Sequence, residues 1–108
     1  MDVLERDFKR RVDEIGARLR TLDPEVWPEV RQEILSADSV EWVRGERRAT
    51  LILHAADAQP HYSLTLLAGE GPHPDAMAIG VDDADLVEML VQPIAALLAD
   101  RGSEIEGT

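Results

Sequence analysis

Cysteine is absent from the 108 residues of the chain. This absence excludes disulfides, catalytic thiolates, cysteine-based zinc sites and iron–sulfur clusters. It also favours a reducing compartment, where disulfides are rare. Residues 1–16 are charged throughout and contain no apolar run typical of a signal peptide. We therefore expect a cytoplasmic protein.

Long hydrophobic runs and catalytic motifs are also absent. No uncharged apolar stretch reaches the roughly 18 residues of a membrane-spanning helix. Gly69 and Gly71 are followed by prolines instead of a helix, so they do not form a phosphate loop. No nucleophile elbow or HExxH pair occurs. We predict a protein that is not an enzyme and needs no cofactor. If it were an enzyme, His54, His61 and Tyr62 would be the first candidates.

Basic residues are few, and their distribution is uneven. The net charge is −11. Residues 1–22 contain six basic and five acidic residues, whereas residues 69–108 contain nine acidic residues and one basic residue, Arg101. Such a field repels nucleic acid and anionic membranes, and it attracts cationic partners. Solubility alone is a second explanation for the acidity.

The remaining composition indicates a globular domain, because 44% of the residues are hydrophobic. A chain of this length buries roughly two-thirds of its unfolded surface, which is enough for one core. The aromatic residues are Phe8, Trp27, Trp42 and Tyr62, so the core should be largely aliphatic. We expect one domain over residues 1–102 and a flexible tail over residues 103–108.

Two helices are predicted at the N-terminus. Apolar residues recur at spacings of three and four over residues 2–21, the helical period. Gly16 within this helix suggests a close approach by another element. Asp23 and Pro24 are typical of a helix start, and Val26, Val30 and Ile34 follow at spacings of four. They predict a second helix over residues 24–35.

Strands follow in the middle of the chain. Alternating apolar residues and turn residues predict strands over residues 40–44, 47–55, 61–68 and 75–81. Short turns between consecutive strands favour an antiparallel meander. With a last helix after residue 82, the order is α-α-β-β-β-β-α. We predict an α+β two-layer sandwich, in which the helices cover one face of a four-stranded antiparallel sheet.

The last helix has an unusually broad apolar arc. Its members are Leu86, Val87, Met89, Leu90, Val91, Ile94, Leu97 and Leu98. Either the first helices pack on its other side, or the arc carries an oligomer or partner interface. In the second case Met89, Leu90 and Leu97 are the candidate interface residues.

Two groups of residues could hold a metal ion. His54 and His61 lie near the ends of one hairpin, with Asp57 between them, and such ligands suit zinc. No fourth ligand is evident. His73 precedes a group of acids, but Asp82-Asp83-Ala84-Asp85 matches no calcium loop and is explained by helix capping. We therefore expect no metal site.

The leading functional hypothesis is a non-catalytic acidic protein that covers a basic site on a partner protein, as immunity proteins and antitoxin-like inhibitors do. The candidate partner-binding residues are Asp75, Asp82, Asp83, Asp85 and Glu88. A homodimeric chaperone or adaptor of the secretion type, using the last helix, is the first alternative. A small enzyme or ligand-binding domain with a pocket between sheet and helices is the second. Nucleic acid and membrane are not expected partners.

Overall fold

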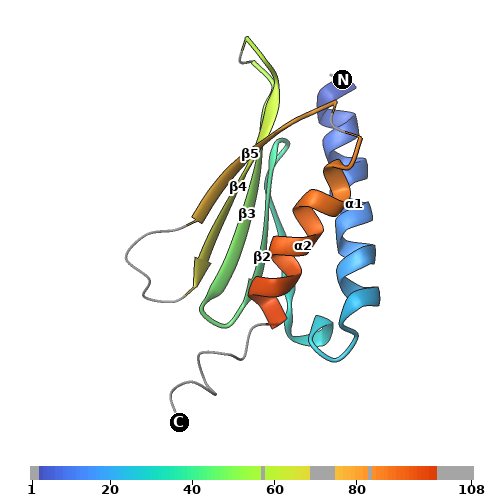
Figure 1. Ribbon diagram of the computed structural model, residues 1–108, viewed down its shortest axis with the longest axis vertical. Helices are drawn as coiled ribbons and strands as arrows, with labels where there is room; N and C mark the ends of the chain where they lie inside the picture. Colours follow the sequence, from blue (N-terminus) through green and yellow to red (C-terminus); the bar gives the residue numbers. More distant parts are fainter. Residues whose placement is uncertain (1–2, 57, 69–74, 83, 100–108) are drawn as a thin grey trace.

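The computed structural model describes residues 3–56, 58–68, 75–82 and 84–99. Its elements are α1 (Val3–Leu22), a 3-10 helix η1 (Trp27–Glu29), β1 (Arg31–Ser36), β2 (Ser39–Arg44), β3 (Arg47–His54), β4 (His61–Ala68), β5 (Asp75–Gly80) and α2 (Leu86–Ala99). The strands form one antiparallel sheet in the order β1-β2-β3-β4-β5. Both helices lie on the same face of this sheet (Figure 1). The predicted α+β class is confirmed, but the sheet has five strands instead of four.

The second predicted helix, over residues 24–35, is wrong. Only the short η1 forms there, and residues from Arg31 onward become the edge strand β1. Asp23 still caps a turn, because its carboxylate accepts a hydrogen bond from the Val26 amide at 3.2 Å. Ile34 pairs with Val40 of β2, and β-branched side chains such as Ile34 suit a strand. Pairing with the next strand along the chain therefore overrides the local spacing of four.

The four strands predicted from the sequence are confirmed to within one residue at either end. Gly45, in the turn between β2 and β3, has a φ of +61°. This left-handed backbone suits glycine at the first position of a two-residue hairpin turn. The turn fixes the register in which Trp42 lies opposite Ala49.

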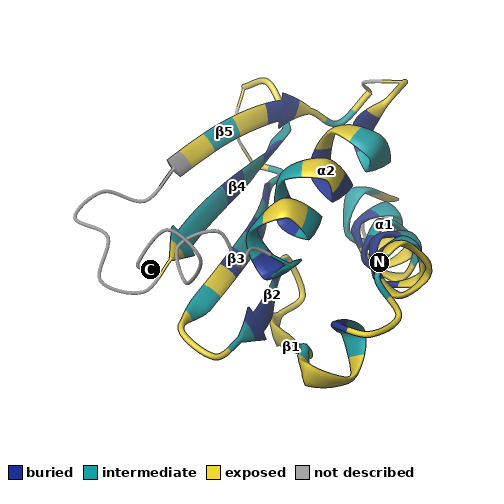
Figure 2. Ribbon diagram, turned by 60° about the horizontal axis from the view of Figure 1, so that its bottom comes forward, coloured by how far each residue is buried: buried dark blue, intermediate teal, exposed yellow. Residues whose placement is uncertain are grey.

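The core lies between α1, α2 and the inner face of the sheet (Figure 2). α1 contributes an apolar stripe of Phe8, Val12, Ile15 and Leu19. The inner face of the sheet contributes Val40, Trp42, Ala49, Leu51, Leu53, Tyr62, Leu64 and Ile79. The ring of Phe8 stacks on that of Tyr62 with centroids 6.0 Å apart. The aromatic residues therefore anchor an otherwise aliphatic core.

Gly16 marks a close approach, as the sequence predicts. A Cβ atom at this position would lie 2.6 Å from the side-chain oxygen Oε1 of Gln32 in β1. The same oxygen accepts a hydrogen bond of 2.7 Å from the indole Nε1 of Trp42. The missing side chain on α1 thus leaves room for the amide that satisfies a buried indole.

α2 packs on β3 and β4 and lies beside α1. Its buried residues are Leu86, Leu90, Val91, Ile94 and Leu98. The broad apolar arc is therefore explained by two contacts, one with the sheet and one with α1. The helix begins at Leu86 instead of residue 82, and its first turn includes a hydrogen bond of 2.8 Å from the Met89 amide to the Asp85 carbonyl. Neither α1 nor α2 is long and apolar enough to cross a membrane.

Candidate functional site

Because consecutive strands are neighbours in the sheet, the charge gradient along the sequence is also a charge gradient across the sheet. Ten of the eleven basic residues lie between Arg6 and Arg48, which means in α1 and in β1 to β3. β4 has no charged residue, and the sole charged residue of β5 is Asp75. Because the strands follow one another in space, the arginines of the sheet lie in β1, β2 and the central strand β3, and none lies in β4 or β5.

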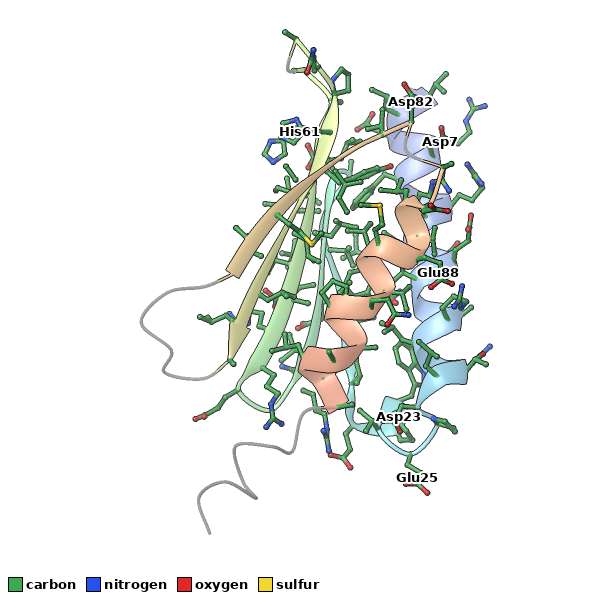
Figure 3. All side chains as sticks on the ribbon, in the orientation of Figure 1. Asp7, Asp23, Glu25, His61, Asp82 and Glu88 are labelled. Carbon is green, nitrogen blue, oxygen red and sulfur yellow. The ribbon has the colours of Figure 1, made fainter. Side chains whose placement is uncertain are left out.

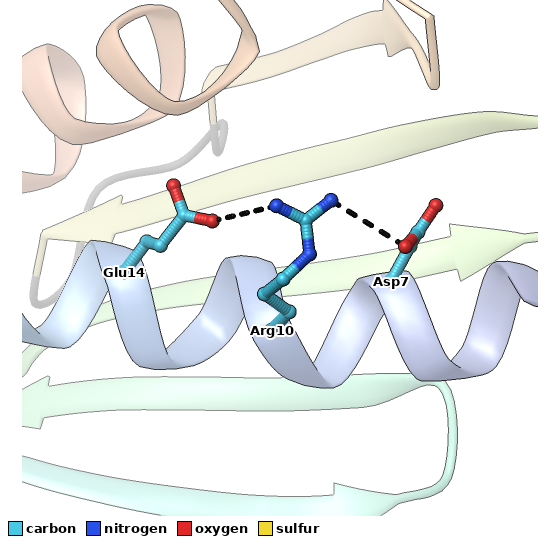
Figure 4. A network of polar contacts seen from close by, with 3 residues as sticks. All are labelled: Asp7, Arg10 and Glu14. Atoms are coloured by element: carbon cyan, nitrogen blue, oxygen red, sulfur yellow. Dashed lines mark hydrogen bonds and ion pairs between the residues drawn. The ribbon is translucent and has the colours of Figure 1, made fainter.

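Several of these arginines are neutralised by acids close to them. Arg10 lies between two carboxylates of its own helix, at 3.4 Å from Asp7 and 3.1 Å from Glu14 (Figure 4). Arg48 of β3 lies 3.5 Å from a carboxylate oxygen of Glu41 in β2. The exposed pairs of Arg10 contribute about 0–1 kcal/mol each to stability. The main consequence of these ion pairs is to offset part of the positive charge on that side.

The predicted partner-binding residues are divided by the structure. Asp82 and Asp85 are exposed in the turns between β5 and α2, where Figure 3 labels Asp82 close to the start of α1. Asp75 is the first residue of β5, and its side chain lies outside the described part of the chain, as does Asp83. Glu88 forms an ion pair with Arg18 of α1.

The Arg18–Glu88 pair connects the two helices. The hydrogen bond from Arg18 is the main reason that the pKa of Glu88 lies below its ordinary value of 4.5. A second hydrogen bond, from Gln92, lowers this pKa further, whereas burial opposes both. Both partners are roughly half exposed, so solvent weakens their attraction. Glu88 therefore acts within the molecule, at the contact of α1 and α2.

We expect the Glu88→Gln variant to be less stable than the parent at neutral pH but not in acid. The folded-state pKa of Glu88 lies below the unfolded value, so the pair stabilises the fold above about pH 4.5 and its contribution is lost as pH falls through the folded pKa. Urea midpoints measured from neutral to acidic pH should converge for the two proteins. Glu25→Gln, in the exposed turn after α1, is the control. Parallel curves for Glu88→Gln and the parent would contradict the role of the pair.

The candidate interface residues of the last helix do not form one exposed patch. Leu90 is fully buried in the core, so no partner reaches it while α2 is packed. Leu97 packs partly against the core. Met89 is 40% exposed and is the member of the three that reaches the surface most. Most of the apolar arc of α2 is therefore packed within the single chain.

His54 and His61 do face each other across the β3–β4 hairpin. Their rings stack with centroids 4.6 Å apart. Nε2 of His54 lies 2.8 Å from the Ser63 hydroxyl, and Nδ1 of His61 lies 3.1 Å from the Gln59 carbonyl. Among the described residues, no three ligating side chains come together to hold a metal. Tyr62, the third candidate for catalysis, is buried in the core, and this burial raises the pKa of its hydroxyl.

An apolar cleft of about 300 Å³ lies where the end of α1, η1 and the last turns of α2 meet. Leu19, Leu22, Val26, Trp27, Val30, Ala95, Ala96, Leu98 and Ala99 form most of its wall, together with Asp23 and Gln92. Asp23 is its acidic residue, and that carboxylate already accepts the Val26 amide hydrogen bond. The cleft thus has the shape of a small apolar ligand site without a set of groups for acid–base chemistry.

The two edges of the sheet differ in how they are protected. On β1 the register shifts between Ile34 and Ser36, and Arg31 and Glu33 add a charge pair at 3.9 Å. Bulges and charges of this kind discourage further strands from pairing. β5 pairs with β4 without any register shift, and residues 76–80 contain no charge and no proline. Within the part of the chain that the structure describes, no strand pairs with the other side of β5.

Sequence reasoning predicted the strand but missed its open edge. The signal was present, since the last strand of a meander always lies at a sheet edge and Ala76-Met77-Ala78-Ile79-Gly80 lacks the usual protective residues. No family model matches the chain, and no curated protein or solved structure is significantly similar to it. The site is therefore defined by its own geometry.

Proposed function

We propose that this chain is a non-catalytic binding protein that binds a basic partner protein through β5 and the turns that follow it. The binding surface consists of β5 together with Asp82 and Asp85, and is called the β5 surface below. One observation carries the proposal: the described residues from Thr50 to Ala99 include no lysine or arginine, whereas both turn carboxylates are exposed. The result is a strand edge, followed by acidic turns, that contains no basic residue of its own.

Electrostatics of this kind act mainly on encounter and orientation. A surface of one sign attracts a cationic partner from a distance and raises the association rate, and it disfavours anionic competitors. Salt reduces this attraction, because the Debye length is about 10 Å at 0.1 M ionic strength. The proposed partner is therefore recognised by basic side chains, and its binding should weaken steeply as salt is added.

The test compares two charge-reversed proteins with equal net charge. The first is Asp82→Lys/Asp85→Lys, and the control is Glu25→Lys/Glu46→Lys, whose residues are also exposed. Glu25 lies at the opposite end of the molecule from Asp82 (Figure 3), and Glu46 lies in the turn between β2 and β3. The probe is a fluorescent peptide of about nine residues that alternates valine and threonine and has lysines at both ends. Fluorescence anisotropy at low salt should show binding weakened about tenfold or more in the first variant and much less in the control.

Equal weakening in the two variants would contradict the proposal. In that case the peptide would respond to net charge alone, and the acidity would serve solubility. A peptide with the same valine–threonine sequence but with glutamates at both ends should not bind the parent protein. Circular dichroism spectra of both variants, which change exposed residues alone, should match that of the parent.

A further inference from the structure

The open edge of β5 has a defined hydrogen-bonding pattern, which can be followed from the neighbouring strands. The Leu53 amide donates to the Asp38 carbonyl at 2.8 Å, across the end of the β2–β3 pair. In an antiparallel strand successive backbone groups point to opposite neighbours. The backbone of His54 therefore points toward β4, where it is paired with His61.

The same alternation continues to the edge. Because the backbone N–H and C=O groups of His61 point toward β3, those of Tyr62 and Leu64 point toward β5. There these two residues pair with Ile79 and Met77. The backbone groups of Ala76, Ala78 and Gly80 must then point away from the sheet. Among the described residues, no strand pairs with these N–H and C=O groups. With small side chains and an unbroken register, such an edge is a template for one more strand.

We propose that β5 binds an extended peptide segment as a sixth strand, and that this segment has an uncharged centre and basic ends. The inference rests on the proposed function and adds the manner of binding. Main-chain hydrogen bonds to Ala76, Ala78 and Gly80 supply affinity. The side chains of the added strand alternate between the two faces of the sheet. On the outer face they lie beside the small residues of β5, and on the inner face they lie beside Met77, which is partly buried.

The charges at the two ends of β5 select the ends of the peptide. An aspartate stands at each end of the uncharged run, because Asp75 precedes Ala76 and Asp82 follows Val81. Next to Asp82, an open cleft of about 590 Å³ lies between the start of α1 and the hairpin end, with Leu4, Pro60 and Val81 in its wall. Lysine and arginine bury an apolar stem and keep a charged tip, which suits a cleft of this composition.

A second copy of this chain fits the same edge poorly. In an antiparallel pair of two β5 strands, the Asp75 end of one copy lies beside the Asp82 end of the other. Like charges in this position destabilise a strand pair. A cationic peptide meets the same two ends with opposite charge, so charge complementarity favours it over self-association.

Amide hydrogen exchange, measured residue by residue by NMR, tests the inference on the unaltered protein. In the free protein the amides of Ala76, Ala78 and Gly80 should exchange fast, whereas those of Met77 and Ile79 are protected by β4. Saturation with the lysine-flanked valine–threonine peptide should slow exchange at the first three residues about tenfold or more. The amide of Ile34 on the other edge should not change.

A proline variant gives an independent readout. Ala78→Pro removes an amide that points away from β4, so the β4–β5 pairing can persist, and it should weaken peptide binding about tenfold or more. Ile34→Pro makes the same change at the outward position of β1 and should leave binding unchanged. If Ala78→Pro does not fold, the exchange experiment still decides.

The outcomes separate the inference from the proposed function. Binding that depends on Asp82 and Asp85 without slower exchange at Ala76, Ala78 and Gly80 would overturn strand addition but keep the basic partner. Absence of any binding to the peptide would overturn both. A doubled mass in sedimentation, with these three amides already protected in the free protein, would replace the peptide with a second copy and also overturn the inference.

Discussion

Replacement of Trp42 by alanine is expected to lower the free energy of unfolding by about 3–5 kcal/mol, the range for a buried tryptophan. Trp42 lies in the inner face of β2 with no exposed surface and is among the largest fully buried side chains of the core. A domain of this size has a total stability of about 5–15 kcal/mol. The variant should therefore be marginal or unfolded at 37 °C.

The loss at Trp42 has a packing part and a hydrogen-bond part, which two further variants separate. Gln32→Ala removes the acceptor of the indole and should cost about 1–3 kcal/mol, because a buried donor is left unpaired. Trp27→Ala, which changes a partly buried residue of η1, should cost less than Trp42→Ala. Urea denaturation followed by circular dichroism is the appropriate measurement, since fluorescence changes with either tryptophan. A loss of under about 1 kcal/mol for Trp42→Ala would show that β1 and β2 are not packed as described.

The region from Val26 to Leu35 shows where sequence reasoning failed. Val26, Val30 and Ile34 have helical spacing. All six residues of β1 are exposed, so buried and exposed residues do not alternate along this strand. A half-buried strand is recognised by its alternation, and an exposed edge strand has none. What holds β1 is its hairpin pairing with β2 and the Gln32–Trp42 hydrogen bond, and neither contact leaves a periodic apolar pattern in residues 31–36.

The parts that were predicted well depend on local signals. The β2–β3 turn is fixed by Gly45, and the inward positions of β3 follow from simple alternation of Ala49, Leu51 and Leu53. The charge gradient is also a property of the sequence, and the meander preserves it in space. The role of Glu88 could not be predicted, because its partner Arg18 lies on another element and comes close only when α1 and α2 pack.

Arg44 illustrates a similar tertiary contact with a larger expected effect. Its side chain is only 14% exposed, at the end of β2. Nη1 donates to the Leu98 carbonyl in the last turn of α2 at 2.6 Å, and Nε and Nη2 lie 3.1 and 3.0 Å from Glu29 Oε1. The last carbonyls of a helix lack intrahelical partners, and α2 has no basic residue in its own last turn. Arg44 therefore supplies from β2 the positive charge that stabilises the end of α2.

We expect Arg44→Met to lower the free energy of unfolding by about 2 kcal/mol, because it keeps an apolar stem and removes charged hydrogen bonds. Arg44→Lys should lie in between, since an ammonium group cannot reproduce the planar fork that reaches both partners. Arg48→Met is the control: Arg48 is half exposed, it pairs at 3.5 Å with Glu41, whose side chain is 14% exposed, and among the described residues it makes no hydrogen bond or ion pair with α2, so its loss should cost less than that of Arg44. Equal costs for Arg44→Met and Arg48→Met in urea denaturation would show that the contact with Leu98 adds no stability. A larger cost at Arg44, with faster amide exchange in the last turn of α2, would identify Arg44 as the side chain that fixes this helix to the sheet.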